Sequence, residues 1–323
     1  MIDTVRLEFQ KFARNGDSYT QIPEGKSSAE GEVSVVDKAS ALRLIHYRSR
    51  NGKSAIRAVE VSLSRLYSGK RHNSRPLRSQ SEVDDAMRML WRIFGRFARQ
   101  PSPGSWWFSR TDLAWDFYTN AQHFIHAHSH ATHPRCESWA ATYSQNALTT
   151  GRNWVGTDMV IKFYDRKAKA RHLGKQTDKP TLIGNLPRTL RVEIEFTGQR
   201  LKKLLGKGQP LRSLDFAHCY QTFRKILLEF APQTTEFVPI KAKDEAIFWA
   251  EFKGLQVLTQ LLSPASAITA PTRRELRKKY PRWLKQRTPY KVDWHWMLPP
   301  QFPPARSVWP PTATLVTAPP PSG

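Results

Sequence analysis

The sequence predicts an α+β fold in which an antiparallel sheet packs against helices and is followed by a helical, basic C-terminal region. Apolar and polar residues alternate in several segments before residue 208, which is typical of strands with one buried face. Apolar residues recur every three or four positions at 81–100 and again after residue 209, which is typical of helices. Prolines crowd the end of the chain. We therefore expect a sheet domain at 1–208, a helical region at 209–297 and a disordered proline-rich tail at 298–323.

Composition points to a polyanionic partner. The 323 residues include 51 Lys and Arg against 27 Asp and Glu, which gives a formal net charge of +24 and a pI near 10.3. Solubility needs far less charge, so nucleic acid and an anionic membrane surface are the candidate partners, beside a solvated basic surface that binds nothing. The sequence has no apolar run of about 18 residues and no basic amphipathic helix with a strong apolar face. Nucleic acid is therefore the expected partner, and no membrane is expected.

Cysteine usage and the opening residues indicate the compartment. The two cysteines, Cys136 and Cys219, are too few for a disulfide framework or a zinc site. Residues 1–12 alternate like a strand and do not resemble a signal peptide. We therefore expect a protein of the reducing cytoplasm.

Three predicted strands share an apolar face and a charged face. In the segment 105–117, one face carries Trp107, Thr111, Leu113, Trp115 and Phe117, and the other carries Arg110, Asp112, Ala114 and Asp116. In the segment 159–166, the apolar residues Met159, Ile161 and Phe163 oppose Val160, Lys162, Tyr164 and Arg166. In the segment 189–196, the apolar residues Leu190, Val192, Ile194 and Phe196 oppose Arg191, Glu193 and Glu195. Three such strands suggest one working surface on a single antiparallel sheet, to which Val5, Leu7 and Phe9 of the first strand contribute core residues.

Helical spacing marks the remaining elements. The segment 81–100 has Ser81 as a plausible N-cap and a basic outer face, which either contacts DNA or is solvated. The segments 213–231 and 244–262 carry three- and four-residue apolar spacing. The segment 272–291 gathers basic residues around Tyr280, Trp283 and Tyr290.

The carboxylates of the charged faces suggest a metal site. Asp and Glu oxygens are hard ligands suited to Mg²⁺ or Mn²⁺. Such an ion would neutralise a phosphodiester oxygen in a transition state. The candidate ligands are Asp112, Asp116, Glu193 and Glu195. The alternative is that Glu193 and Glu195 pair with Arg191 on a solvated sheet face.

Tyr164 is the candidate nucleophile. A phenol that attacks phosphorus forms a covalent phosphotyrosine link, which stores the energy of the broken strand for later rejoining. The ordinary tyrosine pKa near 10 is too high for an efficient nucleophile at neutral pH. A metal and a nearby cation would lower the pKa of the phenol, and Arg166 and Lys167 follow it directly.

Four motifs, in order, give the chain a resemblance to a known family. They are MIDTVRL at 1–7, SRTDLAWDF at 109–117, IKFYDRKAKA at 161–170 and LRVEIEFTGQRLKKLLG at 190–206. The chain resembles the gene II/X replication initiators of filamentous phages, and more loosely the rolling-circle initiators of plasmids. The resemblance covers about residues 1–206, and a weaker similarity extends into the basic C-terminal segment.

The resemblance implies a site-specific endonuclease and ligase that nicks one strand at a replication origin through a 5′-phosphotyrosine intermediate. It implies Tyr164 as nucleophile, Arg110 and Asp112 as the family's arginine-x-aspartate, and Arg191 and Glu193 as its arginine-x-glutamate. Asp116 and Glu195 match only some relatives, and either Arg166 or Lys167 takes the place of the lysine that follows the tyrosine. The implied cofactor is Mg²⁺ or Mn²⁺. The implied partners are single- and double-stranded origin DNA, a host replication helicase and a polymerase in the bacterial cytoplasm.

A histidine cluster offers a different metal site. The segment HFIHAHSHATH at 123–133 holds five histidines, and His126-Ala-His128 precedes Tyr164 and Lys167 as in histidine-metal rolling-circle nucleases. Ala127 is small where a bulky apolar anchor is expected. The alternatives are an exposed loop after the Asp116 strand and adventitious metal binding.

The basic C-terminal segment is the expected site of duplex binding, because Lys and Arg neutralise phosphates. The predicted contacts there are Arg273, Arg274, Arg277, Lys278, Lys279, Arg282, Lys285 and Arg287, with Arg191 from the sheet. Tyr280 and Trp283 either stack on unpaired bases or anchor a helix. A different class of function, a non-catalytic basic DNA-binding protein that uses charge alone, remains the rival.

Overall fold

The structure is a computed structural model of the 323-residue chain. It describes residues 1–13, 31–37, 42–48, 54–69, 75–98, 105–117, 119, 121–128, 131–141, 151–166, 168–169, 190–206, 214–231, 233–237, 269–271, 273–275, 277–278 and 288–302. The predicted helix at 244–262 lies outside these residues, as do Tyr280 and Trp283.

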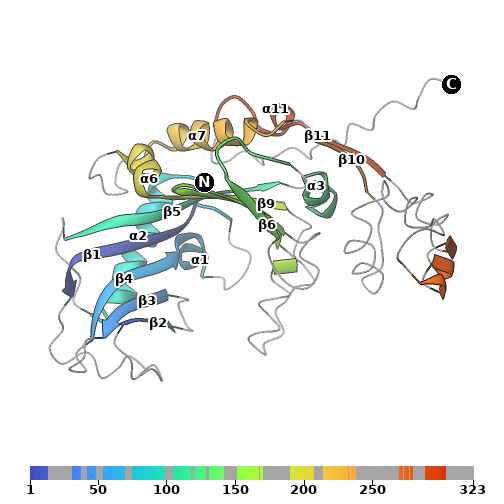
Figure 1. Ribbon diagram of the computed structural model, residues 1–323. Helices are drawn as coiled ribbons and strands as arrows, with labels where there is room; N and C mark the ends of the chain where they lie inside the picture. The colour runs from blue at the N-terminus through green and yellow to red at the C-terminus, as the bar shows by residue number, and fades with distance from the viewer. Residues whose placement is uncertain are drawn as a thin grey trace.

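An antiparallel sheet with strands of different lengths forms the centre of the molecule (Figure 1). The described residues build nine strands in the order β2-β3-β4-β1-β5-β9-β8-β7-β6. Their bounds are β1 Ile2–Ala13, β2 Gly31–Asp37, β3 Leu42–Arg48, β4 Ser54–Ser62, β5 Trp106–Phe117, β6 Ser138–Ala141, β7 Gly151–Gly156, β8 Met159–Asp165 and β9 Leu190–Thr197. Each neighbouring pair is antiparallel. The predicted α+β class with an antiparallel sheet is confirmed.

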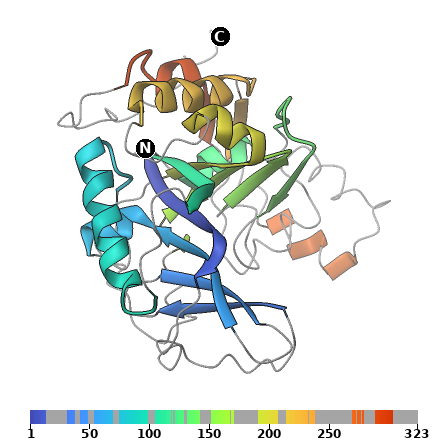
Figure 2. The same cartoon turned by 90° about the vertical axis from the view of Figure 1, so that its left-hand side faces the viewer.

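Helices cover the apolar face of this sheet. They are α1 Leu63–Ser68, α2 Gln80–Phe94, α3 Ala121–Ala127, α6 Gly198–Leu205, α7 Phe216–Leu228 and α11 Trp294–Met297. Helix α2 runs beside β1, and α6 and α7 lie together across β5 and β9 (Figure 2). Ring contacts between Phe9 and Phe94, and between Trp115 and Tyr220, join the sheet to α2 and α7. Burial of one side of the sheet leaves its other side to the polar residues.

The C-terminal part departs from the purely helical prediction. Gln233–Phe237 forms β10 and Thr288–Val292 forms β11, and these two strands pair antiparallel in a small second sheet next to α3. The start of the expected disordered tail is ordered. Leu298 is fully buried, the Tyr220 hydroxyl donates to the Pro299 carbonyl at 2.7 Å, and Phe302 contacts the Trp115 ring. Residues 303–323 lie outside the described residues.

The predicted helix at 81–100 is present with different ends. Helix α2 begins one residue earlier, after the N-cap Ser79, whose hydroxyl accepts from the backbone N–H of Glu82. It ends at Phe94 before Gly95, which has right-handed helical dihedrals. Among the described residues, no helix is long and apolar enough to span a membrane.

A bulge in β5 overturns the predicted position of Trp107. Arg6 pairs with Arg110, but the next residue, Leu7, pairs with Phe108, so Ser109 is an extra residue in β5. The extra residue reverses the alternation toward the start of the strand. Phe108 therefore faces the core, and Trp107, expected among the apolar residues, is 43% exposed.

The turn between β7 and β8 caps helix α6. Asp158 has a left-handed backbone (φ 58°), its carbonyl accepts from Thr197 N–H at 3.0 Å, and its carboxylate accepts from Gln199 N–H at 2.8 Å. Gly198, also left-handed at φ 47°, lies against this carboxylate, and a Cβ there would lie 2.2 Å from Oδ1 of Asp158. Asp158 thus supplies the N-terminal hydrogen bond that the Thr197 side chain does not.

Substitution of Gly198 by alanine should destabilise the fold by about 2 to 3 kcal/mol. The alanine would adopt a left-handed backbone and displace the capping carboxylate. Asp158→Ala removes the cap and leaves an alanine at a left-handed position, and it should cost about 1 to 2 kcal/mol. Gly95→Ala is the matched control, because Gly95 is right-handed and a Cβ there meets its nearest atom at 3.4 Å. Urea unfolding measures the three values, and an equal effect of both glycine substitutions would contradict this account.

Candidate active site

The polar face of the sheet is built by the registers of three adjacent strands. Asp112 of β5 pairs with Glu195 of β9, and Asp116 of β5 pairs with Arg191 of β9. Tyr164 of β8 pairs with the same Arg191. Since side chains of directly paired residues share a face, the charged sides of β5, β9 and β8 coincide.

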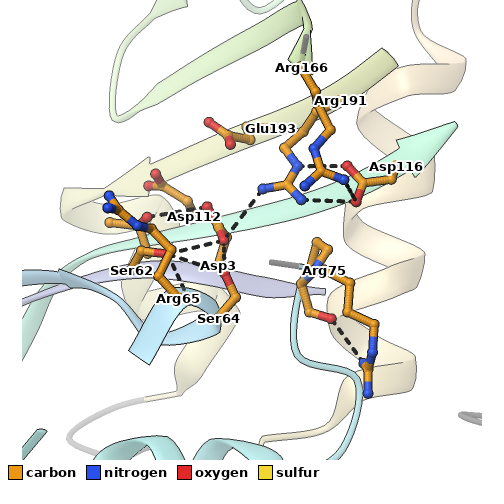
Figure 3. A network of polar contacts seen from close by, with 12 residues as sticks. Asp3, Ser62, Ser64, Arg65, Arg75, Asp112, Asp116, Arg166, Arg191 and Glu193 are labelled. Carbon is orange, nitrogen blue, oxygen red and sulfur yellow. Dashed lines mark hydrogen bonds and ion pairs between the residues drawn. The ribbon is translucent and has the colours of Figure 1, made fainter. Parts of the chain in front are cut away.

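Asp116 is held by two guanidinium groups (Figure 3). Arg191 donates to both of its oxygens, from Nε at 2.6 Å and Nη2 at 2.9 Å, and Arg166 donates from Nη1 at 2.9 Å. Arg191 also lies 3.7 Å from Asp3, which in turn accepts from the Ser64 hydroxyl. Asp116 is buried, and the two guanidinium groups hold the pKa of its carboxyl below its usual range against the effect of burial.

A second network surrounds Arg110. This side chain donates to Asp112 through Nε at 2.8 Å and Nη2 at 2.7 Å, and it lies 3.1 Å from Glu195. Lys162 donates to the same Glu195 at 2.6 Å. The carboxylates around Arg110 raise the pKa of its guanidinium despite burial. Glu195 is thus an anchor for two cations from the neighbouring strands.

Tyr164 and Glu193 meet between these two networks. The Tyr164 hydroxyl donates a hydrogen bond to Oε1 of Glu193, and both residues are buried, at 2% and 5% exposure. Among the described residues, no cation pairs with Glu193. Lys169, four residues after Asp165 at the end of β8, places its ammonium 3.9 Å from the centroid of the Tyr164 ring. A cation over the ring face is attracted by its negative potential.

Asp112 is a buried carboxyl whose pKa is raised. Burial raises its pKa to about 7, the negative charge of Glu193 adds to the rise, and Arg110 and Lys162 oppose it. A carboxyl in this range binds a proton at neutral pH unless a further positive charge approaches it. Asp112 and Glu193 are therefore two carboxylates close enough to repel one another.

The donor set fits a two-carboxylate magnesium site better than the predicted four-carboxylate one. Mg²⁺ in phosphate-handling sites takes one or two carboxylates and fills its remaining positions with water and substrate oxygens. Asp116 and Glu195 already hold two cations each. Among the described residues, no three His, Cys, Asp or Glu side chains gather as a metal-binding group. Asp112 and Glu193 are the remaining pair.

The structure brings most of the predicted sheet residues together. The polar face holds Tyr164, Arg166, Arg110, Asp112, Asp116, Glu193, Glu195 and Arg191, in the two networks or in the Tyr164–Glu193 pair, whereas Lys167 lies outside the described residues. Asp3, Ser64 and Lys169 were missed. Asp3 is the second residue of β1 and Ser64 is the second residue of α1, and neither position carries a sequence signal of its own. Lys169 had a signal, since it belongs to the basic run that follows Tyr164.

The histidine segment is not the exposed loop that we expected. Residues 121–127 form α3, and His128 and His133 are buried. The His128 Nδ1–H donates to the Phe124 carbonyl at 2.9 Å, and the ring stacks on Phe124 and touches Phe163. Burial lowers the pKa of His128 to about 4. This histidine is a core residue, so the geometry does not favour the His126/His128 metal site.

The C-terminal basic residues are described only in part. Arg273, Arg274, Arg277 and Lys278 line a cavity of about 520 Å³ together with Ala270. Lys279, Arg282, Lys285 and Arg287 lie outside the described residues.

Comparison with known proteins finds a likeness to solved structures. No protein-family model matches the chain, and no curated protein matches it. The chain is similar to the structure of a rolling circle replication initiator protein from Geobacillus stearothermophilus, with 13% identity and a TM-score of 0.34 over 76% of this chain and 88% of that chain. A likeness of this degree assigns no role to any residue.

His128 should make the fold sensitive to acid. The unfolded imidazole takes up a proton below about pH 6.5 and the folded one only below about pH 4, so a stabilising contribution present above pH 6.5 is lost as the pH falls toward 4. The loss amounts to about 3 kcal/mol at most. His128→Phe should reduce this loss in urea unfolding at pH 7 and pH 4.5, whereas His295→Gln, at an exposed position, should not. Equal acid sensitivity of wild type and His128→Phe would refute the assignment.

Proposed function

We propose that the chain is a rolling-circle replication initiator that nicks and rejoins one DNA strand through a covalent bond to Tyr164. The observation that carries the proposal is the hydrogen bond from the Tyr164 hydroxyl to Glu193, on a sheet face that also holds Asp112. A nucleophile and a carboxylate base in direct contact are the pair that such chemistry needs.

The proposed cleavage is a transesterification. Glu193 accepts the phenol proton while Tyr164 Oη attacks the scissile phosphorus. The bond from phosphorus to the 3′ oxygen breaks, this oxygen takes up a proton from water, and the 5′ phosphate stays on Tyr164. In rejoining, a 3′ hydroxyl attacks the phosphorus of the phosphotyrosine and gives its proton to water. The bond from phosphorus to Tyr164 Oη breaks, and the phenolate recovers its proton from Glu193.

Three cations support the developing negative charge in this proposal. Arg191 and Arg166 lie beside Tyr164 and both donate to Asp116, and Arg191 also lies 3.7 Å from Asp3. Lys169 lies over the phenol ring, where its attraction grows as the hydroxyl loses its proton. Arg110 keeps Asp112 in place.

Asp112 and Glu193 are the residues proposed to hold Mg²⁺ or Mn²⁺, with Glu193 using the oxygen that does not accept from Tyr164. When bound, the ion neutralises a non-bridging phosphate oxygen. Asp112 then ionises, since the nearby positive charge lowers the carboxyl pKa that burial had raised.

The wider proposal assigns DNA to the basic surface. The net charge of +24 favours origin DNA, single- and double-stranded, with Arg273, Arg274, Arg277 and Lys278 as phosphate contacts. A host helicase and polymerase, a bacterial cytoplasmic location and a filamentous-phage relationship belong to the same proposal. A binding protein without catalysis is the competing function.

Tyr164→Phe tests the proposal. Incubated with Mg²⁺ and a supercoiled circle bearing the candidate origin, the wild-type chain should nick the circle and become attached to it. Tyr164→Phe should lose attachment by at least 10³-fold, because the attacking oxygen is gone, while it retains binding within about twofold. Gel analysis of nicked circles and mapping of the DNA-linked peptide measure both effects.

Two variants make the test specific. Tyr67→Phe, at an exposed tyrosine, should nick like the wild type. Lys169→Met should keep attachment but slow it at neutral pH and shift its pH profile upward, because the phenol loses a neighbouring cation. Origin binding with no nicking by wild type would favour the non-catalytic binding protein.

The metal proposal has a readout that needs no DNA. At pH 8, millimolar Mg²⁺ should raise the melting temperature of the wild-type chain, because an ion that binds only the folded state stabilises it. Glu193→Gln should abolish this rise, whereas Glu195→Gln should retain it. A rise that survives Glu193→Gln, or that vanishes only in Glu195→Gln, would move the ion away from Asp112 and Glu193.

A further inference from the structure

A cavity of about 510 Å³ lies on the helix side of the sheet, away from the Tyr164 face. Its apolar floor includes Phe196 and Ile226, which are both 2% exposed. Phe196 follows Glu195 in β9, so it points to the opposite side of the sheet from the polar networks. Helices α6 and α7, which lie side by side in both views, form its walls (Figures 1 and 2).

Positive side chains surround this cavity. Arg200 and Lys203 come from α6, His218 comes from α7, and Arg135 comes from the segment before β6. No acidic residue lines it among the described residues. Arg135 is paired with Glu229, which does not line the cavity. Arg200, Lys203 and His218 therefore have no acidic partner among the described residues.

Arg200 is fixed in a position suited to an anion. Its Nε donates to the Thr157 carbonyl at 3.1 Å, and its Nη1 lies 3.8 Å from the Met159 sulfur. These contacts use two of the five guanidinium N–H donors. A guanidinium held in this way loses little freedom when it binds a phosphate, which makes it a good phosphate ligand.

The shape and lining of the cavity select a class of ligand. Inorganic phosphate is far smaller than 510 Å³, whereas a mononucleotide matches the range of small-molecule sites. A nucleotide offers a flat base for the interior of the cavity and a phosphate for its cationic side chains.

We propose that this cavity is a nucleotide-binding site, with the base inside the cavity and the phosphate at Arg200 and Lys203. The nucleotide is either free or a unit of a DNA strand. The site is independent of strand cleavage at Tyr164, so it stands or falls separately from the proposed nicking activity.

Helix α6 provides a matched pair of lysines for the test. Lys202 and Lys203 are both exposed and adjacent, but only Lys203 lines the cavity. Calorimetric titration of the full chain with thymidine 5′-monophosphate should show affinity reduced about tenfold by Lys203→Gln, since one charge-assisted contact is lost. Lys202→Gln removes the same charge and should change affinity less than twofold. Inorganic phosphate and a tetraglutamate peptide should bind more weakly than the nucleotide.

A second arm identifies the source of the nucleotide. Anisotropy of a labelled ten-residue oligothymidylate, measured in the Tyr164→Phe background, avoids covalent attachment. A selective loss in Lys203→Gln relative to Lys202→Gln assigns the cavity to a DNA strand, and equal losses assign it to a free nucleotide. The proposal is overturned if the mononucleotide does not bind, if both lysine variants weaken it equally, or if the acidic peptide binds as tightly.

Discussion

The register between β5 and β9 is the constraint on which the rest of the structure depends. It sets Asp112 opposite Glu195 and Asp116 opposite Arg191, and it turns Trp115 and Phe117 toward the helices. A slip by one residue would exchange the two sides of the strand. An unpaired carboxylate would then enter the aromatic core at a cost of several kcal/mol, and the aromatic rings would lose their contacts. Charge pairing and core packing therefore specify the same register.

The buried charges of the polar face are not paired evenly. Asp116 holds two guanidinium groups, and Glu195 holds Arg110 and Lys162. Such pairs fix the strands, because removal of either partner would leave a buried charge. Glu193 has only the phenol of Tyr164 among the described residues. The uneven pairing separates carboxylates that hold the sheet together from the one that is available for proton transfer.

Much of the sheet and the shared face of the site could be predicted from the sequence. The strands β8 and β9 and the end of β5 each bury one side, and this produces a regular alternation of apolar and polar residues. Alternation placed Tyr164, Glu193 and Asp116 on a common face, although it could not pair them. Alternation failed at Ser109, since a bulge reverses the pattern without any residue that announces it. The composition of 123–133 suggested a polar loop, yet His128 is neutral and packs like an aromatic residue. Strands β10 and β11 pair across more than 50 residues, a distance that local patterns do not reach.

Under the proposed function, DNA must reach Tyr164, which is only 2% exposed, and the contact between Lys169 and its ring suggests a route. The Lys169 ammonium lies over the Tyr164 ring, a contact worth about 0.5 to 2 kcal/mol. A hydrogen bond from an ammonium to a charged phosphate is worth about 1.5 to 3 kcal/mol. Replacement of the ring contact by a hydrogen bond to phosphate is therefore favourable, because the hydrogen bond is the stronger of these two interactions. In this proposal DNA would draw the Lys169 side chain away from the ring and keep its charge beside the scissile bond, so the burial of Tyr164 would not exclude the substrate.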